Sequence, residues 1–424
     1  MQRTEECVIL LRRDQKSHFQ LEIVPGMVSR TQTATLDIAR KLFDSYESFK
    51  ASEITSHRFT QADLLKWLRS LKDQELFTEL PLGTSGEGRA LSLYSIGNGL
   101  TKVLLWSQMH GDEPTATMAL VDIFHFFAGH PDHNVTKTIR EKLTLLVIPM
   151  LNPDGAERFT RRTAHLIDIN RDALALETPE ARILKETCST YRPEYGFNLH
   201  DQDARLTVGT TKKIAAIALL APVPDESRTD TPVRERAKKV ASSLAQILNV
   251  FIPGHIAKWD DTFEPRAFGD NIQKWGTSTV LIESGGWKND RNKFFIRKLN
   301  CIALLTTLYS IATGEIAHAD TGIYEQIPWN TKLGCDYIIR NAVLQSNHRT
   351  IPLHVDIGVN VETRRNASTG SLERVATVTE IGDLSLFIAL EEERDAHGAE
   401  LDAKRINLDY SFPESELPLL LKRM

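Results

Sequence analysis

The stretch VLLWSQMHGDEPTATMALVDIFHFF, residues 103–127, carries the pattern that decides the fold. Its first four residues, Val103 to Trp106, are a short apolar run of the kind found in strands that are buried on both faces of a sheet. Pro114 stands where the first residue of a helix is expected, and we predict a helix from there to Phe127. His110 and Glu113 lie between the two elements, so the sequence places both at a strand-to-helix junction.

Further apolar runs continue this alternation. Leu143–Met150 and Thr279–Ile282 are short and rich in leucine or β-branched residues, so they are predicted as buried strands. Phe294–Ala312 is typical of a long apolar helix, and Gly314 suits the position that ends it. Because strands and helices alternate, the sequence predicts an α/β fold in which helices cover the sheet.

The chain divides into three predicted parts. Residues 1–56 form an N-terminal extension with one helix over Leu36–Phe49, where apolar residues recur at helical spacing. Residues 57–318 hold the alternating strands and helices. Residues 324–424 form a β-rich domain, with strands predicted at Asp336–Val343, Ile351–Thr363, Ser371–Ile381 and Leu384–Glu391.

The composition is that of an ordinary globular protein, with 41% hydrophobic and 25% charged residues in a chain of 424. Its net charge of −5 argues against nucleic-acid binding, which needs a basic excess on some face. The four cysteines are far apart and form no CxxC pair. This excludes a cysteine metal knuckle and a redox motif, and favours idle or buried thiols in a reducing compartment.

Neither a secretory leader nor a membrane span is expected. The apolar run from Cys7 to Leu11 is short and is followed by the charged stretch 12–14, so it does not match the centre of a signal peptide. No stretch approaches the roughly 18 apolar residues that a spanning helix needs. We therefore predict a cytoplasmic protein without a membrane partner.

A metal site is indicated by His110 and Glu113 together with a third residue. Histidine and glutamate three positions apart at a strand-to-helix junction can turn toward one point, although the same pair also fits a surface carboxylate beside a loop histidine. His200 follows another strand-like run, Gly196–Leu199, and completes a set of two histidines and one glutamate. Catalytic zinc sites use such sets of three protein ligands and keep one position open.

Two other groups of polar residues add to this picture. Glu283 ends the apolar run that begins at Val280, where a carboxylate is costly to bury without a partner. Its position suits an active-site crevice, and the alternative is a carboxylate paired with a nearby lysine or arginine. Asn170 and Arg171 can hold a carboxylate through parallel hydrogen bonds, although such a pair is also common on solvated surfaces.

These motifs occur in the order seen in the zinc carboxypeptidase family, which the chain resembles over roughly residues 57–318. The motifs are HGDE (110–113), NPDG (152–155), TRR with DINR (160–171), FNLH (197–200) and LIESGG (281–286). The resemblance implies a mixed central sheet flanked by helices. It also implies one zinc ion per chain, held by His110, Glu113 and His200, with Glu283 as the general base.

The resemblance assigns substrate contacts as well. Asn170 and Arg171 match the pair that binds the terminal carboxylate of the substrate. Arg161 matches the arginine that stabilises the oxyanion, and Arg162 is a possible substitute for it.

One departure from the family concerns the loop before the catalytic glutamate, which usually carries a tyrosine that closes over the substrate. Phe268 stands in the similar stretch here, and phenylalanine shields a site from water but donates no hydrogen bond. Arg266 lies nearby. It either favours an acidic or diaminopimelate-type substrate or is a surface residue paired with Asp270 or Glu264.

We therefore expect a metallocarboxypeptidase that hydrolyses the amide bond next to a free C-terminal carboxylate. One rival keeps the metal site and acts on small metabolites as a zinc-dependent N-acyl amino acid deacylase. A second rival is a binding module that has lost catalysis, and it is disfavoured because all ligand and base positions are filled. The expected partner is a peptide or acyl-amino-acid substrate, and the oligomeric state is left open.

Overall fold

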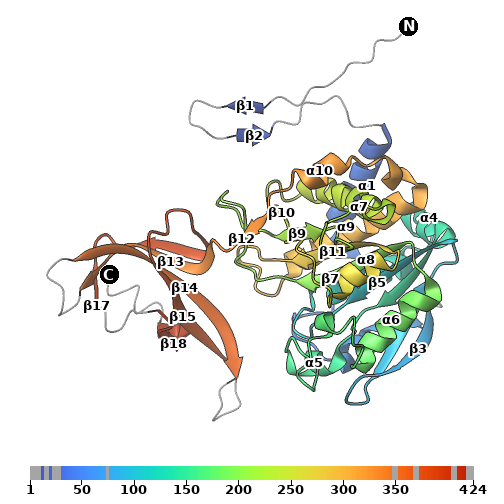
Figure 1. The fold of residues 1–424 in the computed structure, drawn as a ribbon, viewed down its shortest axis with the longest axis horizontal. Helices are drawn as coiled ribbons and strands as arrows, with labels where there is room; N and C mark the ends of the chain where they lie inside the picture. Colours follow the sequence, from blue (N-terminus) through green and yellow to red (C-terminus); the bar gives the residue numbers. More distant parts are fainter. Residues whose placement is uncertain are drawn as a thin grey trace, which may run out of the picture.

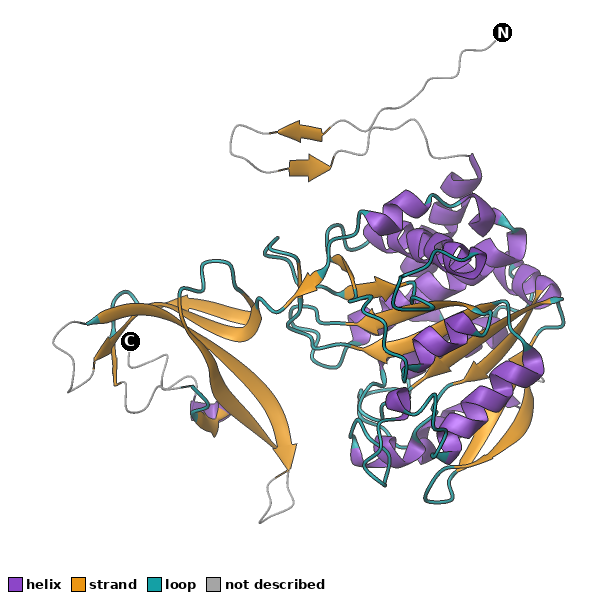
Figure 2. Ribbon diagram, viewed as in Figure 1, coloured by secondary structure: helices purple, strands orange, loops and turns teal. Residues whose placement is uncertain are grey.

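A computed structural model describes residues 11–13, 19–21, 30–72, 76–345, 352–365, 372–402 and 408–416. The main body of the chain is a sheet between two layers of helices, and a second sheet follows toward the C-terminus (Figures 1 and 2). This confirms the predicted α/β class, with a mixed central sheet and a β-rich C-terminal region. The prediction for Cys7 lies outside the described residues.

The central sheet has eight strands in the described part of the chain, in the order β10-β9-β11-β7-β5-β6-β4-β3. The strands are β3 (Thr78–Thr84), β4 (Ala90–Ile96), β5 (Thr101–Ser107), β6 (Leu143–Ile148), β7 (Tyr195–Asp201), β9 (Ile217–Leu220), β10 (Ile256–Lys258) and β11 (Ser278–Ser284). β6, β5, β7 and β11 run parallel, whereas β3, β4 and β9 add antiparallel pairs on either side. The parallel centre therefore directs four carboxyl ends to one edge of the sheet.

The parallel strands are apolar on both faces because helices cover both. On β5, Val103 and Leu105 belong to one hydrophobic core, and Leu104 and Trp106 belong to the other. The larger core packs under α1 (Arg30–Ser45), α2 (Gln61–Lys72), α3 (Thr115–Gly129), α4 (Asn134–Lys142), α7 (Pro232–Asn249) and α9 (Phe294–Thr313). The smaller one packs under α6 (Pro179–Tyr191) and α8 (Phe268–Lys274). This two-sided burial is what their near-continuous apolar sequences require.

Helix α9 corrects one expectation from the sequence. It is 20 residues long with a mean hydropathy of 1.3 over its most apolar window, so by length and composition alone it qualifies as a membrane span. However, 78% of that window is buried inside the protein, and the helix packs against α1, α3, α4 and α7. Its apolar character is therefore explained by its place in the core. The predicted cytoplasmic location stays a prediction.

The N-terminal segment is held on the main body by a buried ion pair. Arg297 in α9 donates from Nε to Asp122 Oδ2 at 2.7 Å, and Asp122 in α3 is fully buried. The same carboxylate accepts from the Tyr46 hydroxyl at 2.6 Å and from the Ala51 amide at 2.8 Å. A helix is present where Leu36–Phe49 was predicted, but α1 begins earlier, at Arg30, and ends at Ser45, where the 3-10 helix η1 (Tyr46–Ser48) follows. Its buried residues share the larger core with α9.

The C-terminal region forms a second sheet with its own core. Among the described residues its strand order is β16-β13-β14-β15-β18, and β17 pairs with β13. The strands are β13 (Gly334–Gln345), β14 (Leu353–Arg365), β15 (Leu372–Gly382), β16 (Ile388–Asp395), β17 (Glu400–Asp402) and β18 (Ser411–Pro413). The strand predicted to start at Leu384 is wrong at its beginning, because residues 384–387 form a turn closed by a hydrogen bond from the Phe387 amide to the Leu384 carbonyl.

The three cysteines in the described part of the chain, Cys188, Cys301 and Cys335, are buried and unpaired. They fill space in separate hydrophobic clusters, which agrees with the prediction of buried thiols. Burial raises the pKa of the Cys188 thiol to about 12, so this group stays protonated at neutral pH.

We predict that breaking the Asp122 network destabilises the protein strongly. Arg297→Met leaves a buried carboxylate without its cation, and we expect a loss of about 3–5 kcal/mol in the free energy of unfolding. Tyr46→Phe removes one hydrogen bond to a charged acceptor and should cost about 2 kcal/mol. Urea unfolding at pH 7 measures both.

The control for this prediction is Arg40→Met, because Arg40 pairs with Asp37 at 2.8 Å with both side chains more than half exposed. Such an exposed pair contributes little, so the control should change stability by about 0.5 kcal/mol or less. Equal losses in Arg297→Met and Arg40→Met would contradict a structural role for the buried network.

Candidate active site

The candidate site lies at the carboxyl edge of the parallel strands, where the chain changes direction across the sheet. From β5 the chain continues to β6 on one side, and it later returns to β7 on the other side of β5. A crevice forms outside the strand ends at such a switch point. His110 follows β5 and His200 lies at the end of β7, so these two residues stand at the switch point.

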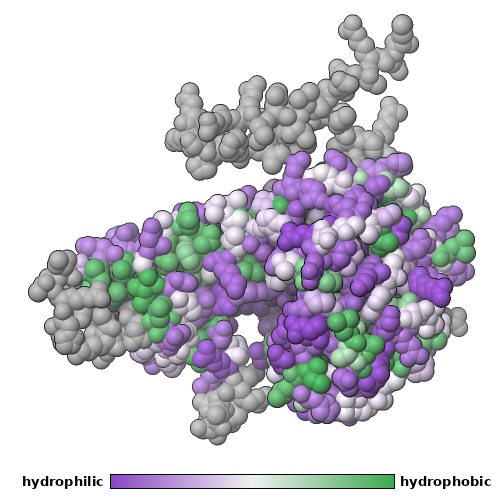
Figure 3. Space-filling model, viewed as in Figure 1, coloured by the Kyte–Doolittle hydropathy of each residue, from purple (hydrophilic) through white to green (hydrophobic). Residues whose placement is uncertain are grey.

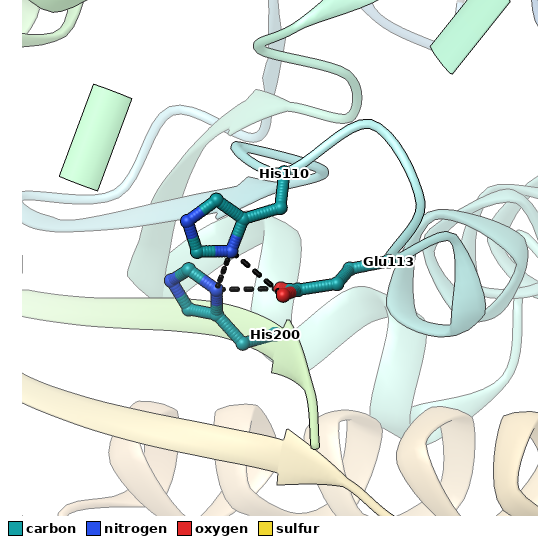
Figure 4. A group of neighbouring side chains, drawn as sticks. All are labelled: His110, Glu113 and His200. Atoms are coloured by element: carbon teal, nitrogen blue, oxygen red, sulfur yellow. Dashed lines mark hydrogen bonds and ion pairs between the residues drawn. The ribbon is translucent and has the colours of Figure 1, made fainter. Parts of the chain in front are cut away.

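Three predicted ligands meet at this point: His110 and Glu113 come from the loop between β5 and α3, and His200 comes from the end of β7 (Figure 4). His110 Nδ1 lies 2.7 Å from one oxygen of Glu113, and His200 Nδ1 lies 2.7 Å from the other. The two Nδ1 atoms are 3.2 Å apart. All three residues are buried, with exposed fractions of 2%, 7% and 2%.

This group fits a divalent cation on chemical grounds. Two imidazole nitrogens and two carboxylate oxygens converge on one small space. Where these atoms present lone pairs they repel each other, and a cation between them removes the repulsion. Two histidines and a glutamate are a set that catalytic zinc sites use. His110, Glu113 and His200 would therefore hold the metal.

Asp168 orients the first of these ligands, and the sequence did not single it out for this role. Its Oδ1 lies 3.1 Å from His110 Nε2, the ring nitrogen opposite the one that faces Glu113. A carboxylate in this position fixes the tautomer and the orientation of a metal-bound imidazole. Burial opposes protonation of His110, but Glu113 and Asp168 together raise its pKa to about 9, so the pocket favours a positive charge.

Glu283 lies beside the ligands, as predicted. It pairs in register with His200 across β11 and β7, which places both side chains at the same edge. Its Oε2 is buried and has no hydrogen-bond partner among the described residues. Burial, and secondly the charge of Glu113, raise the pKa of Glu283 well above its usual range. A cation on the neighbouring ligands would act in the opposite direction and favour the carboxylate.

The two candidate arginines lie differently. Arg161 donates from Nε to Asp168 at 3.0 Å, and its Nη1 lies 3.3 Å from Glu113 Oε1. Its side chain is 43% exposed, so the guanidinium reaches both the ligands and solvent. Arg162 instead donates to the Leu166 carbonyl at the surface. The structure thus brings Arg161 to the metal site and leaves Arg162 away from it, so Arg162 is not a substitute in this arrangement.

Asn170 and Arg171 lie in a short 3-10 helix, η2 (Ile169–Arg171), directly after Asp168. Asn170 Oδ1 accepts from the Phe268 amide at 2.9 Å, which leaves the NH2 group of its side chain as a donor. Arg171 Nε lies 3.4 Å from Glu264. Arg266 is more exposed and pairs with Glu264 at 2.7 Å, so of the two interpretations for this residue the structure shows the surface ion pair.

Phe268 requires a correction. Its side chain is fully buried in the smaller core, together with Trp106, Met109 and Ile272, at the first position of α8. It therefore packs in the core and does not cover the substrate, because an apolar ring gains more from burial than from exposure to water. Its link to the site is the backbone amide that holds Asn170.

Comparisons with known proteins found matches to part of the chain. Residues 64–188 match the family model described as zinc carboxypeptidase. The probable carboxypeptidase 2 of Arthroderma benhamiae is 29% identical over 163 residues, which are 38% of this chain and 30% of that protein. The probable carboxypeptidase 2 of Trichophyton verrucosum is 31% identical over 124 residues, 28% of this chain and 24% of that protein. This chain thus matches less than a third of the length of these curated relatives.

Among solved structures, a metallo-carboxypeptidase from Burkholderia cenocepacia aligns with a TM-score of 0.49 and 16% identity, over 60% of this chain and 70% of that one. The segment matched by the family model contains His110 and Glu113 but ends before His200 and Glu283. The fold of this chain is what brings these two later residues to the same place.

We predict a pH dependence of stability from Asp270, which lies in the first turn of α8 and is only 8% exposed. Burial, and secondly the charge of Glu264, raise the pKa of Asp270 to about 7. A carboxyl group with a higher pKa in the folded state binds more protons there than in the unfolded state. Stability is therefore lost as pH rises from about 4 to about 7.

Asp270→Asn should remove this dependence, because the amide keeps the shape and the acceptor but does not ionise. Urea unfolding from pH 4.5 to 8 should show a smaller decline in the variant than in the parent protein. Parallel pH profiles for the two proteins would show that Asp270 titrates normally.

Proposed function

We propose that this chain, whose residues 64–188 match the zinc carboxypeptidase family model, is a zinc-dependent carboxypeptidase that removes the C-terminal residue of peptides. The observation that carries the proposal is the convergence of His110, Glu113 and His200 at the carboxyl edge of the sheet, with Glu283 beside them. One zinc ion per chain would be held there by these three ligands. The proposed substrate is a peptide with a free terminal carboxylate.

The reaction needs a group that moves protons, and Glu283 is proposed for this role. When bound, zinc supplies Lewis-acid chemistry for hydrolysis of an amide. Glu283 takes a proton from the attacking water and later passes one to the leaving amine. Its unpartnered Oε2 suits this work, since no ion pair with the described residues competes for it.

The basic residues on the other side of the site are proposed to hold the substrate. Arg161 is partly exposed beside Glu113, and there it can donate to the oxygen of the scissile carbonyl as negative charge develops. Arg171 and the NH2 group of Asn170 lie on η2. Asp168 connects this short helix to the metal ligands, because it contacts His110 and also accepts from the Asn170 backbone amide. A carboxylate bound there lies next to the scissile bond, which explains cleavage at a C-terminus.

We predict that Glu283→Gln keeps the metal and loses turnover. The amide cannot accept a proton, so release of C-terminal residues from a mixed peptide pool should fall on the order of 100- to 10,000-fold. Zinc content measured by atomic emission should stay at one equivalent, as in the parent protein, and a chelator should abolish the parent activity.

The matched control is Glu180→Gln. Glu180 in α6 is also a buried glutamate whose Oε2 has no hydrogen-bond partner among the described residues, but its Oε1 accepts from the Gly86 amide and it is not part of the metal site. This variant should keep its activity. Full turnover in Glu283→Gln would remove that residue as the base. Cleavage of N-acyl amino acids with none of peptides would indicate the deacylase instead.

We predict that Arg171→Met weakens recognition of the free carboxylate. Losing a hydrogen-bonded charge pair should lower kcat/KM for peptide acids by about 10- to 100-fold. Arg266→Met is the control on the same surface, because Arg266 is 57% exposed and is engaged with Glu264. Equal effects of the two substitutions, or equal rates on peptide acids and peptide amides in the parent, would contradict the assignment.

A further inference from the structure

Three consecutive residues in the loop between β11 and α9, Arg291, Asn292 and Lys293, contact three separate parts of the protein. This loop directly follows the strand that carries Glu283. Arg291 reaches the C-terminal sheet, Asn292 lies 2.9 Å from His57 Nδ1 in the stretch before α2, and Lys293 reaches the residue next to a metal ligand. The loop is therefore a junction between the metal site and the rest of the chain.

Lys293 is held in an unusual conformation by its side chain. Its φ of 55° lies in the left-handed region, which is unfavourable for a residue with a side chain. The ammonium group donates to the Ser284 carbonyl at 3.0 Å and lies 3.3 Å from Asp201 Oδ2. Its side chain is 17% exposed, so these contacts are largely shielded from water and offset the backbone strain.

Asp201 connects Lys293 to the ligands. It follows His200 in the sequence, and its backbone amide donates to Glu113 Oε2 at 3.2 Å. Its side chain is 7% exposed, and Oδ2 also accepts from Thr115 Oγ1 at 2.5 Å. A second carboxylate so close to Glu113 repels it unless a cation is present, and Lys293 supplies that cation.

The C-terminal sheet holds the same loop from outside. Arg291 Nε donates to Glu391 of β16 at 3.0 Å, and Arg291 Nη2 lies 3.2 Å from the Tyr337 hydroxyl of β13. Glu391 is largely shielded, with 16% of its side chain exposed. In the space-filling view the C-terminal sheet and the main body touch each other, with an opening between them below the contact (Figure 3).

The loop that follows His200 is fastened to the same region. β12 (Asn330–Thr331), which leads into the C-terminal sheet, pairs with β8 (Thr207–Val208). In addition, Arg205 Nη1 lies 3.5 Å from Asp336 Oδ2 of β13. The segments that leave His200 and Glu283 are thus both fastened to residues 330–395.

We propose that the C-terminal sheet is a positioning domain for the metal site and that it acts through the loop 289–293. Within this loop Lys293 is the positioning residue. It holds Asp201 and, through Asp201, the ligands His200 and Glu113. The inference rests on the metal site of the proposed function but not on which bond the enzyme cleaves. The β-rich domain is far from the ligands in the sequence, and this inference gives it a function in metal binding.

The first test measures zinc affinity by competition with a chromophoric chelator, which needs no substrate. Lys293→Met should weaken zinc binding by about 10- to 100-fold, the range for residues that support ligands from outside the first coordination layer. Lys293→Arg should restore most of it, because a cation returns to Asp201. If Lys293→Met does not fold, the double substitution Asp201→Asn with Lys293→Met removes both charges and should fold with weakened zinc binding.

The second test addresses the sheet itself. Arg291→Met and Glu391→Gln should each weaken zinc binding in the same direction by a smaller factor. The control is Arg394→Met, because Arg394 pairs with Glu392 on the same strand, with both side chains exposed and no contact to the loop. It should leave zinc affinity unchanged.

Each result separates the alternatives. Unchanged zinc affinity in Lys293→Met overturns the positioning role. If zinc binding is weakened in Lys293→Met but unchanged in Arg291→Met and Glu391→Gln, the role of the sheet is overturned. A parent protein that binds zinc but cleaves no peptide contradicts the proposed function and leaves this inference standing, whereas a parent that binds no zinc contradicts both.

Discussion

The repulsion among buried lone pairs is the constraint on which the rest of the site depends. Two imidazole nitrogens and two carboxylate oxygens face one point with almost no exposure to water. In such surroundings electrostatic interactions are strong, and only a positive charge makes the arrangement stable. The surrounding residues either supply charge of the right sign or hold the ligands so that the charge can bind.

The charges around the ligands are arranged in two layers. Asp168 contacts the outer nitrogen of His110, and Arg161 in turn contacts Asp168. On the other side, Asp201 contacts Glu113 through its backbone amide, and Lys293 balances the Asp201 side chain. His110 is thus supported by a carboxylate and Glu113 by a backbone amide, and each of the two aspartates has its own cation. The neighbouring Glu283 differs, since its Oε2 has no partner among the described residues, which suits its proposed role in proton transfer.

The sheet explains why such distant residues meet. Parallel strands end at one edge, and the chain switches direction at β5, which is where ligand sites form in sheets of this kind. Helices on both faces allow those strands to be apolar throughout, so the polar groups are confined to the strand ends. The C-terminal sheet lies outside this core, yet it contacts the segments that leave His200 and Glu283.

The sequence by itself determined the α/β class, because apolar runs such as Val103–Trp106 are legible without any long-range contact. It also predicted His110, Glu113, His200 and Glu283, since their ordered motifs are local. It did not predict Asp168 as the partner of His110, nor the pairing of Lys293 with Asp201, because these contacts join residues that are 58 and 92 positions apart.

Only the tertiary structure decided which of several similar residues face the site. Arg161 and Arg162 are adjacent and chemically identical, and the direction of each side chain depends on the fold around it. Phe268 looked like a cover for the substrate, but its ring packs in the smaller core, because it gains more from burial than from exposure to water. Local patterns specify elements and ligand types, whereas side-chain direction follows from burial and charge balance across the assembled chain.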